Sequence, residues 1–168
     1  MLFENDKVFK AWIDKQGFSK LAREQLIKVV PSSIREAKDV VICIDGTNGK
    51  TLWRTETPGQ PTGRKSSSTP CVANGKVYAA GSTHAHCVDA KTGKPVWSVA
   101  LPSKATASSF LVADGRAFIM AGRLVALDAD TGREIWQSEV ARGGNSSPMI
   151  WEHKGYQFII ISAGREVF

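Results

Sequence analysis

The chain has 168 residues, a formal net charge of +6 and 42% hydrophobic side chains, which is enough apolar material for one good core. Its 22 basic and 16 acidic residues are interleaved, so the charge pattern favours a solvated surface over a nucleic-acid groove. The three cysteines form no CxxC pair, which argues against a disulfide framework or a cysteine zinc site, and no apolar stretch is long enough to cross a bilayer.

The first 31 residues differ from the rest and predict two short helices. Apolar residues recur at helical spacing on either side of Gly17, namely Phe9, Trp12 and Ile13, then Phe18, Leu21, Ala22, Leu26 and Val29. Ser19 is placed to cap the second helix and Pro31 to end it. We therefore expect a helical N-terminal segment over residues 1–31. Residues 1–10 lack the apolar region of a secretory signal.

A nine-residue phrase occurs three times and sets the organisation of the chain. Its copies run from an aspartate through a glycine to a tryptophan: Asp45–Trp53, Asp89–Trp97 and Asp128–Trp136. Repetition at a period of about forty residues is typical of repeat architectures. Aliphatic runs such as Val40–Ile44 and Leu124–Leu127 precede the phrase and predict strands. Each copy is therefore expected to join two strands through a tight turn.

The segments between these copies repeat as well and add a second hairpin to each period. Ser68–Tyr78 aligns with Ser108–Phe118, and Ser146–Ile160 is a looser third copy. Asn-Gly and Asp-Gly steps between alternating apolar residues are strong hairpin signals. Four strands per period predict an all-β fold, an incomplete β-propeller of four-stranded antiparallel blades. Its expected parts are a half blade (40–56), two blades (60–100 and 103–140) and a partial blade (145–168).

The pattern Ala-x-Asp-x-x-Thr-Gly-x-x-x-Trp resembles the tryptophan-docking repeat of β-propellers of the pyrroloquinoline-quinone (PQQ) type. That family includes quinoprotein alcohol dehydrogenases and the lipoprotein propeller of the outer-membrane β-barrel assembly machinery. The third copy fits every position, whereas Cys43 and Cys87 replace alanine in the first two, and Asn48 replaces threonine in the first. The residues that carry the motif are Asp45, Gly49, Trp53, Asp89, Thr92, Gly93, Trp97, Asp128, Thr131, Gly132 and Trp136.

The resemblance implies a structural role for these residues. Each tryptophan is expected to dock on the neighbouring blade, near that blade's glycine and near the small residue two positions before its aspartate. The resemblance also implies that relatives are commonly exported to the periplasm or the cell surface, although this sequence shows no export signal.

Two functions are compatible with the resemblance. The first is a non-catalytic propeller segment that acts as a scaffold for a protein partner or for the remaining blades, with no cofactor of its own. The alternative is part of a PQQ- and calcium-dependent dehydrogenase of alcohols or sugars. No acid of the chain matches that family's catalytic base or calcium ligands, and only Arg64 or Lys65, in a loop between blades, is placed to contact a quinone carboxylate. Binding to nucleic acid or to an anionic surface is a third possibility, which a steep salt dependence would reveal.

One local cluster has metal-ligand chemistry. His84 and His86 alternate with Ala85, so a strand would place both imidazoles on one face, where they are weak candidates for metal ligands. The sequence supplies no third ligand near them. We therefore expect no metal site.

The number of repeats predicts an open structure. A propeller needs at least four blades to close, and the chain encodes fewer, so we expect it to belong to a larger propeller. Completion of a shared blade by two chains is the alternative. Uncovered blade faces predict an isolated chain that is poorly soluble, partly molten or oligomeric. A monodisperse monomer with a sharp thermal transition would contradict this.

Overall fold

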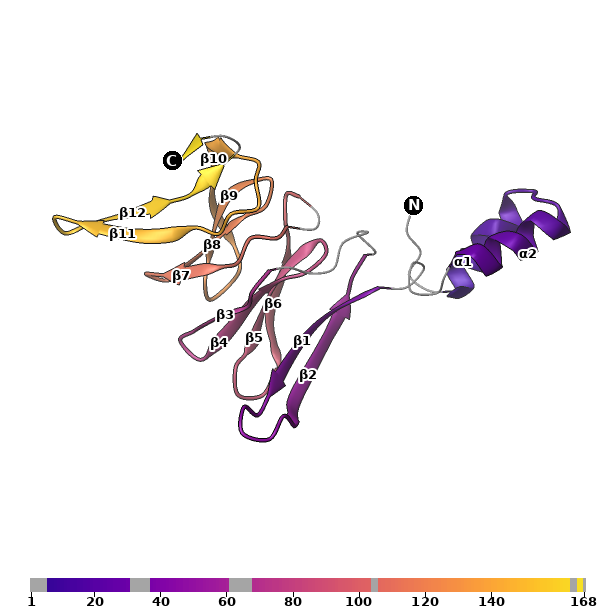
Figure 1. Cartoon of the computed structure of the whole chain (residues 1–168), viewed down its shortest axis with the longest axis horizontal. Helices are drawn as coiled ribbons and strands as arrows, with labels where there is room; N and C mark the ends of the chain where they lie inside the picture. The colour runs from indigo at the N-terminus through magenta and orange to yellow at the C-terminus, as the bar shows by residue number, and fades with distance from the viewer. Residues whose placement is uncertain (1–5, 31–36, 61–67, 104–105, 164–165, 168) are drawn as a thin grey trace.

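The computed structural model of the chain describes residues 6–30, 37–60, 68–103, 106–163 and 166–167. Two helices, α1 (Asp6–Lys15) and α2 (Lys20–Val29), precede a row of sheets and lie apart from them (Figure 1). Ser19 caps α2, as predicted, because its hydroxyl accepts a hydrogen bond from the amide of Ala22 (3.3 Å). Among the described residues, no helix is long and apolar enough to span a membrane.

The strands form two complete four-stranded sheets with a hairpin on either side. The strands in chain order are β1 (Lys38–Ile44), β2 (Thr51–Pro58), β3 (Cys71–Ala73), β4 (Lys76–Ala80), β5 (His84–Asp89), β6 (Pro95–Ala100), β7 (Leu111–Ala113), β8 (Arg116–Met120), β9 (Arg123–Asp128), β10 (Glu134–Arg142), β11 (Met149–His153), β12 (Tyr156–Ile160), β13 (Ser162–Ala163) and β14 (Glu166–Val167). We call β1–β2 blade 1, β3–β6 blade 2, β7–β10 blade 3 and β11–β12 blade 4.

All pairings within the described blades are antiparallel, which confirms the predicted fold class. The sheets follow one another in a fan and do not close into a ring (Figure 1). Blade 2 and blade 3 share a core in which Tyr78, Cys87 and Trp97 pack with Ile119 and Leu127. A second core joins blade 3 to the segment after blade 4. Its buried members are Phe118, Met120, Leu124, Ala126, Ala141, Ile161 and Ala163.

A β-bulge recurs at the same place in all three copies of the repeated phrase. In each copy, the ladder skips one residue after the turn, and the next residue, the tryptophan, pairs with the small residue of the preceding strand. The pairs are Cys43 with Trp53, Cys87 with Trp97 and Ala126 with Trp136. Because a bulge inserts one residue into the alternation of the strand, it turns the tryptophan to the same face as the small residue of its own blade.

Each docked tryptophan reaches the next blade through its indole. The Nε1 of Trp53 donates to the carbonyl of Ala90 (3.0 Å), and the Nε1 of Trp97 donates to the carbonyl of Ala129 (3.1 Å). A Cβ atom on Gly93 would lie 2.6 Å from the ring of Trp53. A Cβ atom on Gly132 would lie 2.7 Å from the ring of Trp97. Glycine is therefore required at both positions by close approach, and also by φ angles of +71° and +74°.

The prediction that each tryptophan docks near the glycine of the next blade is confirmed. The prediction that it also docks near the small residue of that next blade is wrong. Cys87 belongs to the core between blades 2 and 3, whereas Trp53 docks on blade 2 from the blade 1 side. Ala126 likewise belongs to the core beyond blade 3, away from Trp97. The physical reason is the bulge, which makes the small residue share a face with the tryptophan of its own blade.

The aspartates of the phrase hold their own turns. The carboxylate of Asp89 accepts hydrogen bonds from the amide and the hydroxyl of Thr92 (both 2.7 Å), and Asp128 bonds in the same way to Thr131 (2.8 and 2.7 Å). These bonds, the threonine hydroxyl first, hold the pKa of each aspartate below its ordinary value. Asp45 accepts from the amide and hydroxyl of Thr47 instead, since asparagine replaces the threonine of its copy.

Replacing a docked tryptophan should lower the free energy of unfolding more than replacing an undocked one. Trp97→Ala should lower the free energy of unfolding by about 3–5 kcal/mol, because it removes a buried ring and leaves the close-packed surface of Gly132 uncovered. Trp136→Ala is the matched control, because its side chain is 38% exposed and should cost less. Urea denaturation followed by circular dichroism measures both. Equal losses for the two variants would contradict the docking argument.

Candidate functional site

A cluster of polar side chains lies at the junction of blades 1 and 2. It lies at the end of this junction that is opposite to the docked Trp53. The imidazole of His86, on β5, is 4% exposed and has partners at both nitrogens. Its Nδ1 lies 3.0 Å from the hydroxyl of Ser98 on β6. Its Nε2 lies 3.3 Å from the hydroxyl of Thr57 and 3.5 Å from the carboxylate of Asp39 on blade 1. We call these residues, with Ser82, the His86 cluster.

Asp39 is the anchor of the cluster on the blade 1 side. Its carboxylate accepts hydrogen bonds from the amide of Ser82 (2.9 Å to each oxygen) and from the Ser82 hydroxyl (3.0 Å). Burial alone would raise the pKa of Asp39, but the hydrogen bonds from His86 and Ser82 and the charge interaction with His86 outweigh it. The pKa therefore lies below the ordinary value of 3.8. The ionised carboxylate is the form that this junction favours.

The backbone approaches the cluster so closely that a side chain would not fit. A Cβ atom on Gly81 would lie 2.2 Å from the carboxylate of Asp39 and 2.7 Å from Nε2 of His86. Both distances are below any that a real Cβ contact shows, so a larger residue would push blade 1 away from blade 2. Gly81 is thus a requirement of the junction.

Ser98, His86 and Asp39 have the composition of a hydrolytic triad, and Ser98 is exposed. The geometry favours a different role. The contact between His86 and Asp39 is long, at 3.5 Å, and the carboxylate takes its shorter bonds from Ser82. An orienting acid should instead direct its strongest bond to the imidazole. What the cluster can do is hold two blades together through a satisfied, largely buried polar network.

The two predicted histidines do share a face of β5. The rings of His84 and His86 stack with centroids 6.2 Å apart and an interplanar angle of 21°. The Nδ1 of His84 lies 2.8 Å from the hydroxyl of Thr83. In the part of the chain that the structure describes, no three His, Cys, Asp or Glu side chains gather closely enough to hold a metal ion together. The other sequence candidates, Arg64 and Lys65, lie outside the described residues.

Sequence reasoning identified His86 but missed Asp39, Thr57 and Ser98 as its partners. Ser98 lies opposite His86 in blade 2, whereas Asp39 and Thr57 stand on two strands of blade 1 and reach the imidazole only because blade 1 packs on blade 2. The only available signal was the position of Asp39 at the start of an otherwise aliphatic strand.

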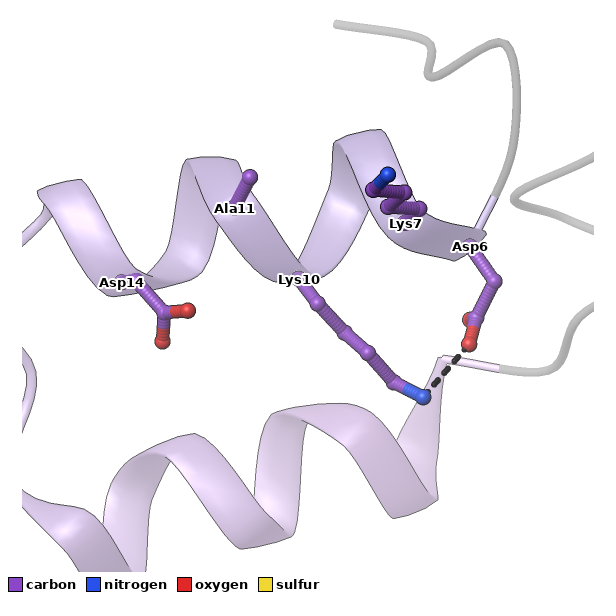
Figure 2. A pocket seen from close by; sticks show the side chains of 5 residues that line it. All are labelled: Asp6, Lys7, Lys10, Ala11 and Asp14. Carbon is purple, nitrogen blue, oxygen red and sulfur yellow. Dashed lines mark ion pairs between the residues drawn. The ribbon is translucent and has the colours of Figure 1, made fainter.

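The surface of α1 contains an open depression of a different kind. It is lined by Asp6, Lys7, Lys10, Ala11 and Asp14, all from one helix (Figure 2). Lys10 forms an ion pair with Asp6 (2.7 Å), one helical turn away. An exposed pair of this kind contributes little to stability, and side chains from a single helix do not enclose a ligand.

One face of blade 4 exposes several large apolar side chains. Cross-strand pairing places Trp151 opposite Phe158 and Met149 opposite Ile160, so all four share that face. Trp151, Phe158, Met149 and Tyr156 are 49%, 43%, 60% and 70% exposed. The rings of Trp151 and Phe158 lie 5.2 Å apart, and His153 stacks on Trp151 at 5.1 Å. We call this surface the aromatic face of blade 4.

A protein-family model covers the repeat region of the chain. It is described as "Outer membrane protein assembly factor BamB", a PQQ-type propeller repeat, and it matches residues 37–158, well over half of the chain. The chain belongs to this family of PQQ-like propeller-repeat proteins. The match contains all three copies of the docking motif and every residue of the His86 cluster.

Curated relatives of this PQQ-like chain match only part of it. The large subunit of glycerol dehydrogenase from Gluconobacter oxydans is 34% identical over 80 residues, which are 46% of this chain and 10% of the enzyme. The corresponding subunit from Gluconobacter thailandicus is 32% identical over 80 residues, with the same shares. The matched segment thus spans about a tenth of the length of either subunit.

Solved structures agree on the fold. BamB from Moraxella catarrhalis superposes with a TM-score of 0.57 at 18% identity, covering 73% of this chain and 35% of that protein. A europium-containing methanol dehydrogenase superposes with a TM-score of 0.52 at 19% identity, covering 59% of this chain and 21% of the enzyme. At these identities the likeness concerns the blades and their order.

The His86 cluster should make the junction of blades 1 and 2 sensitive to acid. Because the folded pKa of Asp39 lies below its unfolded value, its ionised form stabilises the fold above the unfolded pKa. That stabilisation is lost as the pH falls through the folded pKa. Asp39→Asn should lower the free energy of unfolding at neutral pH by about 1–3 kcal/mol, since Ser82 loses a charged acceptor. It should also flatten the dependence on pH below about pH 5.

Urea denaturation at a series of pH values measures both effects. Asp114→Asn is a suitable control, because Asp114 is an exposed residue at a hairpin tip with a φ of 47°, a conformation that asparagine also adopts. If the free energy of unfolding of Asp39→Asn falls with decreasing pH as steeply as that of the wild type, Asp39 does not stabilise the junction as an anion.

Proposed function

We propose that the chain is a non-catalytic PQQ-like propeller segment that serves as a protein-interaction scaffold. The observation that carries the proposal is the aromatic face of blade 4, where Trp151, Tyr156 and Phe158 are each more than 40% exposed. Contiguous exposed aromatic and aliphatic side chains mark surfaces that bind other proteins. The rigid sheet holds them in a fixed arrangement, which lowers the entropy cost of binding.

The roles of the remaining polar groups support a scaffold. Asp45, Asp89 and Asp128 each hold the turn that receives or would receive a tryptophan. His86 and Asp39 use their hydrogen-bonding capacity at the junction of two blades. These five side chains are thus engaged in holding turns or the junction of two blades. The family description, an assembly factor, is in keeping with a role in binding proteins.

A photo-crosslinking experiment tests the scaffold function. Benzoyl-phenylalanine placed at Tyr156, on the aromatic face, should form adducts with a specific protein that mass spectrometry identifies. The same label at Leu21 on α2 is the control, because Leu21 has a similar exposure, 66% against 70%. Absence of adducts at position 156, or an identical set of adducts at both positions, would contradict the proposal.

The second candidate is part of a PQQ- and calcium-dependent dehydrogenase of alcohols or sugars, and the identity with glycerol dehydrogenase favours it. Two observations count against it. One carboxylate oxygen of each motif aspartate accepts hydrogen bonds within its own turn, and among the described residues no three His, Cys, Asp or Glu side chains gather closely enough to hold a metal ion. The scaffold proposal accordingly assigns the chain no cofactor of its own.

Cofactor binding can be measured directly. The purified chain is mixed with PQQ and calcium, freed of unbound quinone by gel filtration, and examined by its absorbance and by reduction of an artificial dye with glycerol. We expect neither retained quinone nor calcium-dependent dye reduction. Retention of one quinone per chain would favour the dehydrogenase and count against the scaffold.

A further inference from the structure

The outer strand of blade 3 differs from the outer strand of blade 2 at its far end. In blade 2, β6 pairs with β5 without interruption up to Ala100, which lies opposite His84. In blade 3, the corresponding ladder between β10 and β9 breaks after Gln137 and resumes at Arg142. The residues between them, 138–141, therefore form a large bulge that blade 2 does not have at this place.

The bulge replaces a pair of opposite charges by a pair of like charges. In the register of blade 2, Glu139 would lie opposite Arg123, as Ala100 lies opposite His84. Arg142 lies opposite Arg123 instead, so the two arginine side chains stand on one face of the sheet. Like charges directly opposite each other in a sheet are destabilising, whereas opposite charges are favourable. The fold thus places two like charges where an ion pair was available.

Contacts within the bulge hold it in this form. The amide of Ala141 donates to the hydroxyl of Ser138 (3.0 Å), and Nε of Arg142 donates to the carbonyl of Glu139 (2.5 Å). Ala141 is 2% exposed and belongs to the core that joins blade 3 to the segment after blade 4. The opposed arginines are therefore part of an anchored segment of the blade and not of a frayed strand end.

Protection of a sheet edge does not account for the bulge. β10 is an edge strand, and bulges and charges at an edge can prevent its pairing with other chains. β2 and β6 are also edge strands, yet their ladders run without a break from the tryptophan to the far end of the strand. Among the described residues, neither Arg123 nor Arg142 forms an ion pair with a carboxylate. Both guanidinium groups are thus available to an anion from outside the chain.

We propose that Arg123 and Arg142 bind a carboxylate in an acidic segment of the protein partner. The planar guanidinium matches a carboxylate in geometry, and two such groups on one face can bind both of its oxygens. Val140, two residues before Arg142 on the same strand, is 68% exposed. An aliphatic side chain beside the arginines favours a peptide, with an apolar residue next to its acid, over a free inorganic anion. This inference rests on the proposed scaffold function and names the chemistry of its partner.

Fluorescence anisotropy tests the proposal on the 168-residue chain. The probe is a fluorescein-labelled peptide, Gly-Leu-Glu-Gly-Leu-Glu-Gly, and a second probe carries glutamine in place of both glutamates. The glutamate peptide should bind, and the glutamine peptide should bind about tenfold more weakly, because it cannot form charged hydrogen bonds. Arg123→Gln and Arg142→Gln should each weaken binding of the glutamate peptide by about tenfold for the same reason. Arg116→Gln is the matched control, because Arg116 is exposed at the opposite end of the same blade, and it should bind like the wild type.

Thermal unfolding without peptide provides a second readout, which also detects a variant that fails to fold. Removal of one of two opposed like charges should raise the Tm of Arg123→Gln above that of the wild type at low ionic strength. About 1 M sodium chloride should remove this difference, because it screens exposed charges beyond about 3 Å. A lower Tm of Arg123→Gln at low ionic strength would mean that the arginine pair serves stability, and would overturn the proposal.

The binding experiment has four outcomes that contradict the carboxylate site. They are no binding of the glutamate peptide, equal binding of the two peptides, unchanged binding in both arginine variants, and displacement of the peptide by an equimolar amount of inorganic phosphate. The last outcome would show a site for simple anions instead of one for an acidic peptide. Any of these results together with a specific crosslink at Tyr156 would leave the scaffold function standing.

Discussion

The contact on which the structure depends is the indole of a tryptophan lying against the backbone of the next repeat. Trp97 fills the space above Gly132 and bonds to the carbonyl of Ala129, which also accepts the hydroxyl of Tyr78. One carbonyl thus receives two donors from the neighbouring blade. The aspartate of the turn fixes this carbonyl and the glycine in place, so a few local bonds within one blade determine how the previous blade packs on it.

This dependence of each blade on the next explains why stability in such a fold is shared between neighbours. A blade that lacks a neighbour keeps its ladder of hydrogen bonds but exposes an apolar face. Blade 3, covered on both sides, buries Phe118 and Ile119, whereas blade 4 exposes Phe158 and Trp151. The same sequence position therefore behaves as core or as surface according to whether a neighbour is present, and the residue type alone does not decide which.

Most of the fold could be predicted from the sequence because its determinants are local. The Asp-to-Gly turn, the apolar strands and the Asn-Gly or Asp-Gly hairpins each lie within a few residues, so their spacing predicted the blades. The docking of Trp53 and Trp97 was implied by the family resemblance of the motif. The placement of Cys87 was predicted wrongly because a bulge shifts the alternation by one residue. The partners of His86 on blade 1 were missed because they meet it only through packing between blades.

The two inter-blade junctions that contain a docked tryptophan differ in chemistry. His86 of blade 2 corresponds to Val125 of blade 3, which is 1% exposed in an apolar core. The fold therefore does not require a buried imidazole at this position. An apolar side chain accepts any apolar surface of suitable shape, whereas a buried imidazole is satisfied only by groups such as Asp39 at hydrogen-bonding distance. The junction of blades 1 and 2 consequently discriminates among partner surfaces in a way that the junction of blades 2 and 3 does not.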